Sequence, residues 1–76
     1  MITSTEMEEL SPREREILEW LANGLPNIAI ASRLGLTDGA VRWRLRHDYP
    51  KLHVRSRVEA ARKYRSAKAE SETIDL

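Results

Sequence analysis

Helix-start and helix-stop signals divide this chain into four short segments, and they constrain the fold more than any other feature. The segment Ser11–Glu14 combines a capping serine, a proline suited to the first helical position and a glutamate three residues after the cap. Gly24 and Gly35 can adopt the left-handed conformation that ends helices. No stretch alternates apolar and polar residues as a half-buried strand would. The sequence therefore predicts an all-α fold.

Three further residues are expected to cap the later helices. Asn27 and Thr37 precede the second and third apolar repeats, and Ser56 precedes the fourth. Glu59 lies three residues after Ser56, which predicts a second capping box. The expected inward faces follow helical spacing and consist of Ile17, Leu18 and Leu21; Ile30, Ala31 and Leu34; Val41, Leu45, Tyr49 and Leu52; and Val58, Ala60, Ala61 and Tyr64.

The length of 76 residues allows one small domain. We expect that domain at residues 10–66, between flexible tails at 1–9 and 67–76. The chain has no cysteine and two histidines, too few for a metal cage, so neither a metal nor a cofactor is expected. It has no apolar run near the ~20 residues that cross a bilayer and no secretion signal at its start, so we expect a cytoplasmic protein without a membrane partner.

Charge is distributed unevenly along the chain. Residues 1–23 carry six acidic side chains and two basic ones, whereas residues 41–65 carry nine basic side chains against Asp48 and Glu59. Such an asymmetry indicates one face suited to a polyanion, although a solvated charged face is an equally good interpretation of charge alone.

The two central segments have the layout of a helix-turn-helix, with a glycine-containing turn before an arginine-rich second helix. On that second helix, Arg42, Trp43, Arg46 and His47 share the side opposite the apolar residues. Arginine can bind guanine edges in a bidentate manner and can also bind phosphates. No spacing of nucleophile, base and acid supports catalysis, so an enzyme is not expected.

Beyond this layout, the sequence resembles the LuxR/FixJ/GerE family. The opening Leu10–Leu18 is similar to the family motif L-T-x-R-E-x-E-V-L, and the likeness extends without a gap over residues 10–65. Further matching segments are Gly24–Asn27, Ile30-Ala31, Arg33–Leu36, Val41-Arg42, Lys51-Leu52 and Val54–Arg57. The resemblance implies a four-helix LuxR-type helix-turn-helix domain, a bacterial origin and a role in transcription regulation.

The resemblance also implies roles for individual residues. The third helix of the family reads bases, which places Arg42, Trp43, Arg46 and His47 at base edges or in the groove. The resemblance also implies contacts with the phosphate backbone of DNA at five positions, which are Asn27, Thr37, Arg44, Lys51 and Arg57. The fourth helix is the dimerisation element, and its interface positions are Val58, Ala61, Arg62 and Arg65. Double-stranded DNA and a second copy of the chain are the expected partners, and RNA polymerase is a further candidate.

Several residues depart from the family pattern. Asp48 replaces an apolar residue, and His53 replaces a glycine at the end of the third helix. Pro50 lies inside the expected third helix, where a proline costs roughly 3 kcal/mol, so that helix should kink or end near Tyr49.

Two alternatives stay open at this stage. The chain could be a protein-interaction module that keeps the fold and modulates a regulator or RNA polymerase without binding an operator itself. It could also resemble a sigma-factor region-four domain, although the segment Leu52–Tyr64 matches the LuxR type better. We further expect either a stand-alone regulator or the effector end of a larger protein.

Overall fold

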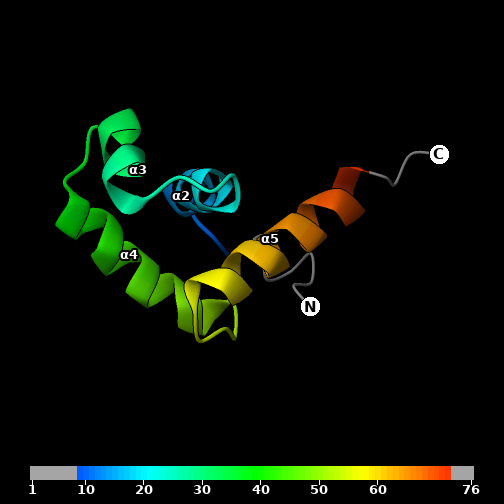
Figure 1. Cartoon of the computed structure of the whole chain (residues 1–76). Helices are drawn as coiled ribbons and strands as arrows, with labels where there is room; N and C mark the ends of the chain where they lie inside the picture. Colours follow the sequence, from blue (N-terminus) through cyan, green and yellow to red (C-terminus); the bar gives the residue numbers. More distant parts are fainter. Residues whose placement is uncertain (1–8, 73–76) are drawn as a thin grey trace.

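The computed structural model describes residues 9–72, and it confirms the all-α prediction with four helices in this part of the chain. They are α2 (Pro12–Ala22), α3 (Asn27–Leu34), α4 (Asp38–Lys51) and α5 (Arg57–Glu72). In Figure 1, α2 lies at the centre, with α3 and α4 on one side of it and α5 on the other. None of these helices is both long and apolar enough to cross a membrane.

Local capping starts α2 and α4 as the sequence predicts. The Ser11 hydroxyl accepts a hydrogen bond from the Glu14 amide at 3.1 Å, and the Glu14 carboxylate accepts one from the Ser11 amide at 2.7 Å. At α4, the Thr37 hydroxyl accepts from the Ala40 amide at 3.1 Å. These side chains provide partners for amides that the first turn of a helix leaves free.

The two predicted stop signals are confirmed in the backbone. Gly24 follows α2 with φ +89°, and Gly35 follows α3 with φ +68°. Both angles lie in the region that side-chain-bearing residues rarely adopt, so glycine removes the strain at each stop. The Gly35 stop lets the chain turn directly into the cap of α4.

Two capping predictions need correction. The cap of α3 is Pro26, without a side-chain hydrogen bond, while Asn27 is already helical. The Asn27 side-chain oxygen is instead engaged by Arg57, so a tertiary contact replaces the local cap. At α5, Ser56 caps the Glu59 amide, but the Glu59 carboxylate accepts from the Arg55 amide rather than from that of Ser56.

Helix α4 continues through Pro50 and ends at Lys51, two residues beyond the predicted end at Tyr49. Proline withholds only the amide that would bind the Arg46 carbonyl, and the amide of Leu52 still bonds the Asp48 carbonyl at 3.1 Å. The proline lies so close to the C-terminus that its cost is confined to the last turn. His53 then takes φ +57°, in the left-handed region typical of glycine.

Helix α5 also runs further than predicted, to Glu72 instead of ending near residue 66. Ala67 is buried in the core, and the Lys68 ammonium lies 2.7 Å from the Glu19 carboxylate of α2. Contacts with α2 therefore hold a stretch whose composition alone suggested a tail. The rest of the predicted tails, at residues 1–8 and 73–76, lies outside the described residues.

A single apolar core joins the four helices, with α2 packed mainly against α5 and α3 against α4. Its buried members are Leu10, Ile17, Leu18, Leu21, Ala22, Ile30, Ala31, Val41, Leu45, Leu52, Val54, Ala60, Tyr64 and Ala67. This core fixes the position of α4 because it buries one stripe of that helix and leaves the opposite stripe in solvent.

A carboxyl group interrupts this core. Asp48 of α4 has no exposed surface, and neither of its oxygens has a donor among the described residues. Its neighbour Glu14 is 8% exposed and binds the Lys51 ammonium at 2.7 Å. Two ionised carboxylates cannot hydrogen-bond each other, whereas a protonated Asp48 can donate to Glu14 and satisfy both groups.

The electrostatics of the pair favour that protonated form. Burial, followed by the hydrogen bond with Glu14 and the negative charge of Glu14, raises the pKa of Asp48 to about 7, and the nearby cations Lys51 and Arg44 oppose this only in part. Burial alone would raise the pKa of Glu14 as well. Its hydrogen bonds with Asp48, Lys51 and the Ser11 amide outweigh burial and lower that pKa to about 2. The pair therefore holds one proton below about pH 7 and loses it as the pH rises above that value.

We expect Asp48→Asn to stabilise the protein above pH 7. In the wild type the folded-state pKa exceeds the ordinary value of 3.8, so stability from the Asp48 proton is present at low pH and is lost as the pH rises toward and through 7. An asparagine amide donates to Glu14 at every pH. The gain at pH 8 should be on the order of 3–4 kcal/mol and should shrink to well under about 1 kcal/mol at pH 4, because the loss begins near the ordinary pKa of 3.8 and is complete above 7. Urea unfolding at both pH values measures it.

Asp38→Asn is the matched control, because Asp38 lies on the same helix but is exposed in its pair with Arg42. The free energy of unfolding of this variant should differ from that of the wild type by less than about 1 kcal/mol. The difference should not grow between low pH and pH 8. Equal pH profiles for Asp48→Asn and the wild type would show that Asp48 is ionised in the folded protein.

Candidate nucleic-acid interface

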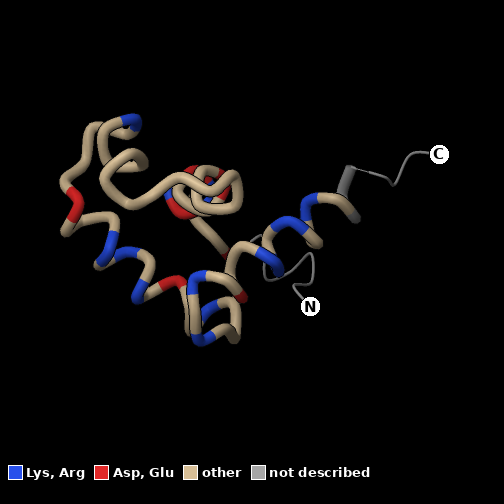
Figure 2. Tube along the Cα trace, in the orientation of Figure 1, with Lys and Arg blue, Asp and Glu red and all other residues tan. Residues whose placement is uncertain are grey.

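Helix α4 presents two opposite faces, and the outer one is basic. Val41 is fully buried and Leu45 is 3% exposed, while Arg42 and Arg46, one residue further along in each case, are exposed. Figure 2 shows basic residues recurring along α4 and α5 and acidic residues gathered on α2. The helix is therefore held from behind by apolar contacts, and its cations are left on the outside.

The exposed cations differ in how strongly the protein itself engages them. Arg42 pairs with Asp38 at 2.6 Å across one helical turn, and both side chains are largely exposed. An exposed pair of this kind contributes no more than about 0.5 kcal/mol, so a phosphate can replace the aspartate. The Arg46 guanidinium makes no hydrogen bond or ion pair with any residue in the described part of the chain.

Trp43 and His47 form a ring pair on the same outer side, with the two planes tilted by 33°. Their ring centroids lie 3.9 Å apart, and His47 Nδ1 lies 3.0 Å from the Trp43 carbonyl oxygen. A carbonyl only accepts, so this contact assigns the proton to Nδ1 and leaves Nε2 of the neutral ring as an acceptor. The indole keeps 59% of its surface exposed, so it does not fold into the core.

The five predicted phosphate-contact residues are placed differently from one another. Thr37 is exposed and uses its hydroxyl to cap α4, and Arg44 is half-buried near Asp48. Lys51 is exposed at its ammonium but pairs with Glu14. Arg57 and Asn27 are bonded to each other.

Arg57 braces α5 against the start of α3. Its guanidinium donates to the Asn27 side-chain oxygen and to the Leu25 backbone oxygen, and all three residues are partly buried. Guanidinium groups only donate, so the Asn27 oxygen must face Arg57, and the amide nitrogen of Asn27 is left free to donate elsewhere. Arg57 thus serves the fold directly.

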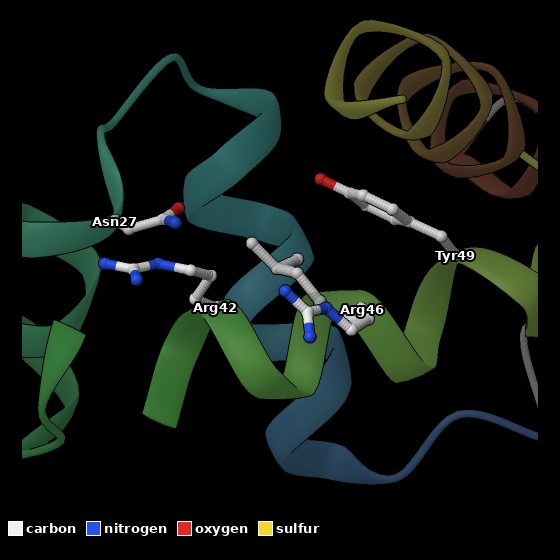
Figure 3. Close-up of a pocket in the computed structure, with 5 residues that line it drawn as sticks. Asn27, Arg42, Arg46 and Tyr49 are labelled. Atoms are coloured by element: carbon white, nitrogen blue, oxygen red, sulfur yellow. The ribbon is translucent and has the colours of Figure 1, made fainter. Parts of the chain in front are cut away.

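A pocket of about 270 Å³ opens between α3 and α4, lined by Asn27, Arg42, Leu45, Arg46 and Tyr49. Figure 3 shows Arg42 and Arg46 projecting from one face of α4, with the Tyr49 hydroxyl directed into the space that they border. The spacing of Tyr49 from Leu45 predicted a core position for its side chain. Spacing could indicate the half-burial of the ring, but nothing in the sequence indicated where the hydroxyl points.

The predicted interface residues of α5 are mostly on the surface. Val58 was expected on the inward face from its spacing, but it is 64% exposed, so that expectation was wrong; Ala61 is half-buried and Arg62 is exposed. Arg65 is also exposed and donates to the Ala22 carbonyl at 3.2 Å, at the C-terminal end of α2. An exposed valine beside arginines is a surface that a second molecule could cover.

The fold and this face define a helix-turn-helix protein, with α3 and α4 joined through the Gly35 turn. Residues 8–64 match the family described as "Bacterial regulatory proteins, luxR family". The chain belongs to this family, as its motifs predict.

Named relatives agree with this assignment. The nitrate/nitrite response regulator protein NarL of Escherichia coli (strain K12) is 46% identical over 59 residues, which cover 78% of this chain and 27% of NarL. The probable transcriptional regulatory protein SgaR of Hyphomicrobium methylovorum is 44% identical over 54 residues, or 71% and 26% of the two chains. The probable HTH-type transcriptional regulator GfsR of Streptomyces halstedii is 51% identical over 51 residues, or 67% and 21%. The matched part of this chain thus spans about a quarter of the length of these relatives.

We expect Arg57→Gln to destabilise the fold by about 1–3 kcal/mol, because it removes two partly buried charge-assisted hydrogen bonds. Arg46→Gln is the matched control and should stay within about 0.5 kcal/mol of the wild type, because Arg46 has no partner among residues 9–72. Urea unfolding of both variants makes the comparison. Equal stabilities would mean that the brace is not formed in solution.

Proposed function

We propose that this chain is a sequence-specific DNA-binding transcription regulator that lays α4 in the major groove. The observation that carries the proposal is the two-faced helix α4, with Val41 and Leu45 buried and Arg42 and Arg46 exposed. A groove-reading helix needs such an arrangement, because apolar packing must fix its orientation while donors reach the base edges. Membership of a family of bacterial regulatory proteins and the regulators among its relatives support this role.

The outer face also offers contacts beyond arginine. The free Nε2 acceptor of His47 suits the exocyclic amino group of adenine or cytosine, and the exposed edge of Trp43 suits a thymine methyl group. Thr37 and Lys51 are proposed to contact backbone phosphates, as is Arg44, with Lys51 exchanging Glu14 for the phosphate.

Dimerisation through α5 is the second part of the proposal. Val58 would be the apolar centre of an interface that also includes Ala61, Arg62 and Arg65. A twofold pair would present two α4 helices to half-sites about one helical turn apart.

The test is selection of bound duplexes from a random pool, followed by titration of the selected site. We expect an enriched, twofold-symmetric sequence and an affinity that falls steeply with salt. Arg46→Gln should weaken binding about tenfold and reduce the salt slope by about one, because one cation is removed.

Glu16→Gln provides a control for altered charge, since Glu16 is exposed on α2 and pairs only with Arg13 of the same helix among the described residues. It should bind the selected site as the wild type does. No enrichment of any sequence at low salt would overturn the DNA-binding proposal.

We expect Val58→Glu to prevent dimerisation by placing a charge at the centre of the proposed interface. Sedimentation of the complex should then give one protein molecule per duplex. The variant should also bind a duplex with two half-sites more weakly than the wild type does. Ile28→Glu is the matched control, because Ile28 is 70% exposed but lies on α3. If Val58→Glu and Ile28→Glu both prevent dimerisation, or if neither does, α5 is not the dimer interface.

A protein-interaction module is the second candidate, favoured by the exposed apolar surfaces of Ile28 and Trp43. Under this alternative, Arg42→Ala would leave regulation in cells intact, whereas Trp43→Ala would abolish it and release a co-purifying partner.

A further inference from the structure

Tyr49 carries a hydroxyl group that the fold itself does not use. The ring is half-buried, yet its hydroxyl makes no hydrogen bond with any group in residues 9–72. The other tyrosine, Tyr64, is buried and donates to the Glu19 carboxylate at 3.3 Å. The Tyr49 hydroxyl is not among the buried polar atoms and faces an open pocket, so it is available to a partner from outside the chain.

The pocket around this hydroxyl is rich in donors. Arg46 lines it without a partner of its own, and Arg42 lines it with only an exchangeable surface pair. Asn27 contributes its amide nitrogen, because Arg57 holds the side-chain oxygen. No acidic residue lines the pocket. Several N–H and O–H donors around one pocket whose lining holds no carboxylate are suited to an anion, once Arg42 exchanges its exposed partner Asp38.

The rest of the lining favours one kind of anion. Leu45 and the ring of Tyr49 give the pocket an apolar side next to its donors, and its volume of about 270 Å³ exceeds what a lone phosphate group fills. A phosphodiester joined to deoxyribose has this mixed character, since its oxygens accept while its sugar is largely apolar. The pocket also opens beside the exposed arginines of α4.

We infer that this pocket binds one phosphate group of the DNA backbone, with Tyr49 donating through its hydroxyl and Asn27 through its amide while Arg46 balances the charge. The inference rests on the proposed function and deepens it, because it assigns a neutral tyrosine and an oriented asparagine to the backbone contact. Such a contact would fix how deeply α4 enters the groove without reading any base.

Tyr49→Phe tests the inference on a short mixed-sequence duplex, since a backbone contact does not depend on sequence. We expect the association constant to fall about five- to tenfold. The salt dependence should stay that of the wild type, because the lost group is uncharged. Thermal unfolding should be unchanged, because no intramolecular bond is lost. Tyr64→Phe is the matched control and should bind DNA normally.

Asn27→Asp provides a second, independent variant. The carboxylate keeps the bond from Arg57, so the fold should be at least as stable, but it replaces the donating amide with an anion that repels phosphate. Binding should fall at least tenfold. Wild-type affinity in both Tyr49→Phe and Asn27→Asp would overturn the inference while leaving DNA binding by α4 intact.

A separate titration distinguishes failure of the proposed DNA binding from failure of the anion site. If the wild type binds no duplex, inorganic phosphate is added while the NMR signals of the Leu45 and Arg46 amides are followed in the wild type and in Tyr49→Phe. Shifts in the wild type alone would overturn DNA as the occupant and assign the pocket to a free phosphate. An absence of shifts would overturn the anion site altogether.

Discussion

Burial of a single stripe of α4 is the constraint on which the rest of the molecule depends. Val41 and Leu45 occupy the core that α2 and α3 complete, and this contact fixes both the rotation of α4 about its axis and the direction of its arginines. Successive helical residues are offset by about a quarter turn or more, so burying these two necessarily exposes Arg42 and Arg46. A change that rotated the helix would remove the basic face without touching any basic residue.

Electrostatics inside the molecule reinforce that arrangement. Among the described residues, two acidic residues of α2 pair with cations of other helices: Glu14 with Lys51 of α4 and Glu19 with Lys68 of α5. These pairs join helices that are far apart in sequence, while Arg46 keeps no internal partner among residues 9–72. The uneven distribution of charge along the sequence therefore corresponds to two roles, because some cations stabilise the fold and others face outward.

The sequence could predict what local chemistry decides. The caps at Ser11 and Thr37 and the stops at Gly24 and Gly35 follow from interactions within four residues, and the four-helix order followed from them. What could not be predicted depends on distant partners. The bond between Arg57 and Asn27 spans 30 residues and displaces the expected cap, and burial of Ala67 against the core extends α5. Periodicity likewise identified the outer face of α4 but not the direction of the Tyr49 hydroxyl.

The ring contact between Trp43 and His47 has a spectroscopic consequence. The chain contains two tryptophans, and they lie in different electrical surroundings: Trp20 of α2 lies under the Arg33 guanidinium at 4.5 Å, whereas Trp43 rests on an imidazole on the outer side of α4. The fluorescence of Trp20 depends on how α2 packs in the fold, and the fluorescence of Trp43 depends on what binds at the basic face of α4. A variant without Trp20 would keep Trp43 as its single intrinsic fluorophore, so binding of a molecule to α4 could be followed without an attached dye.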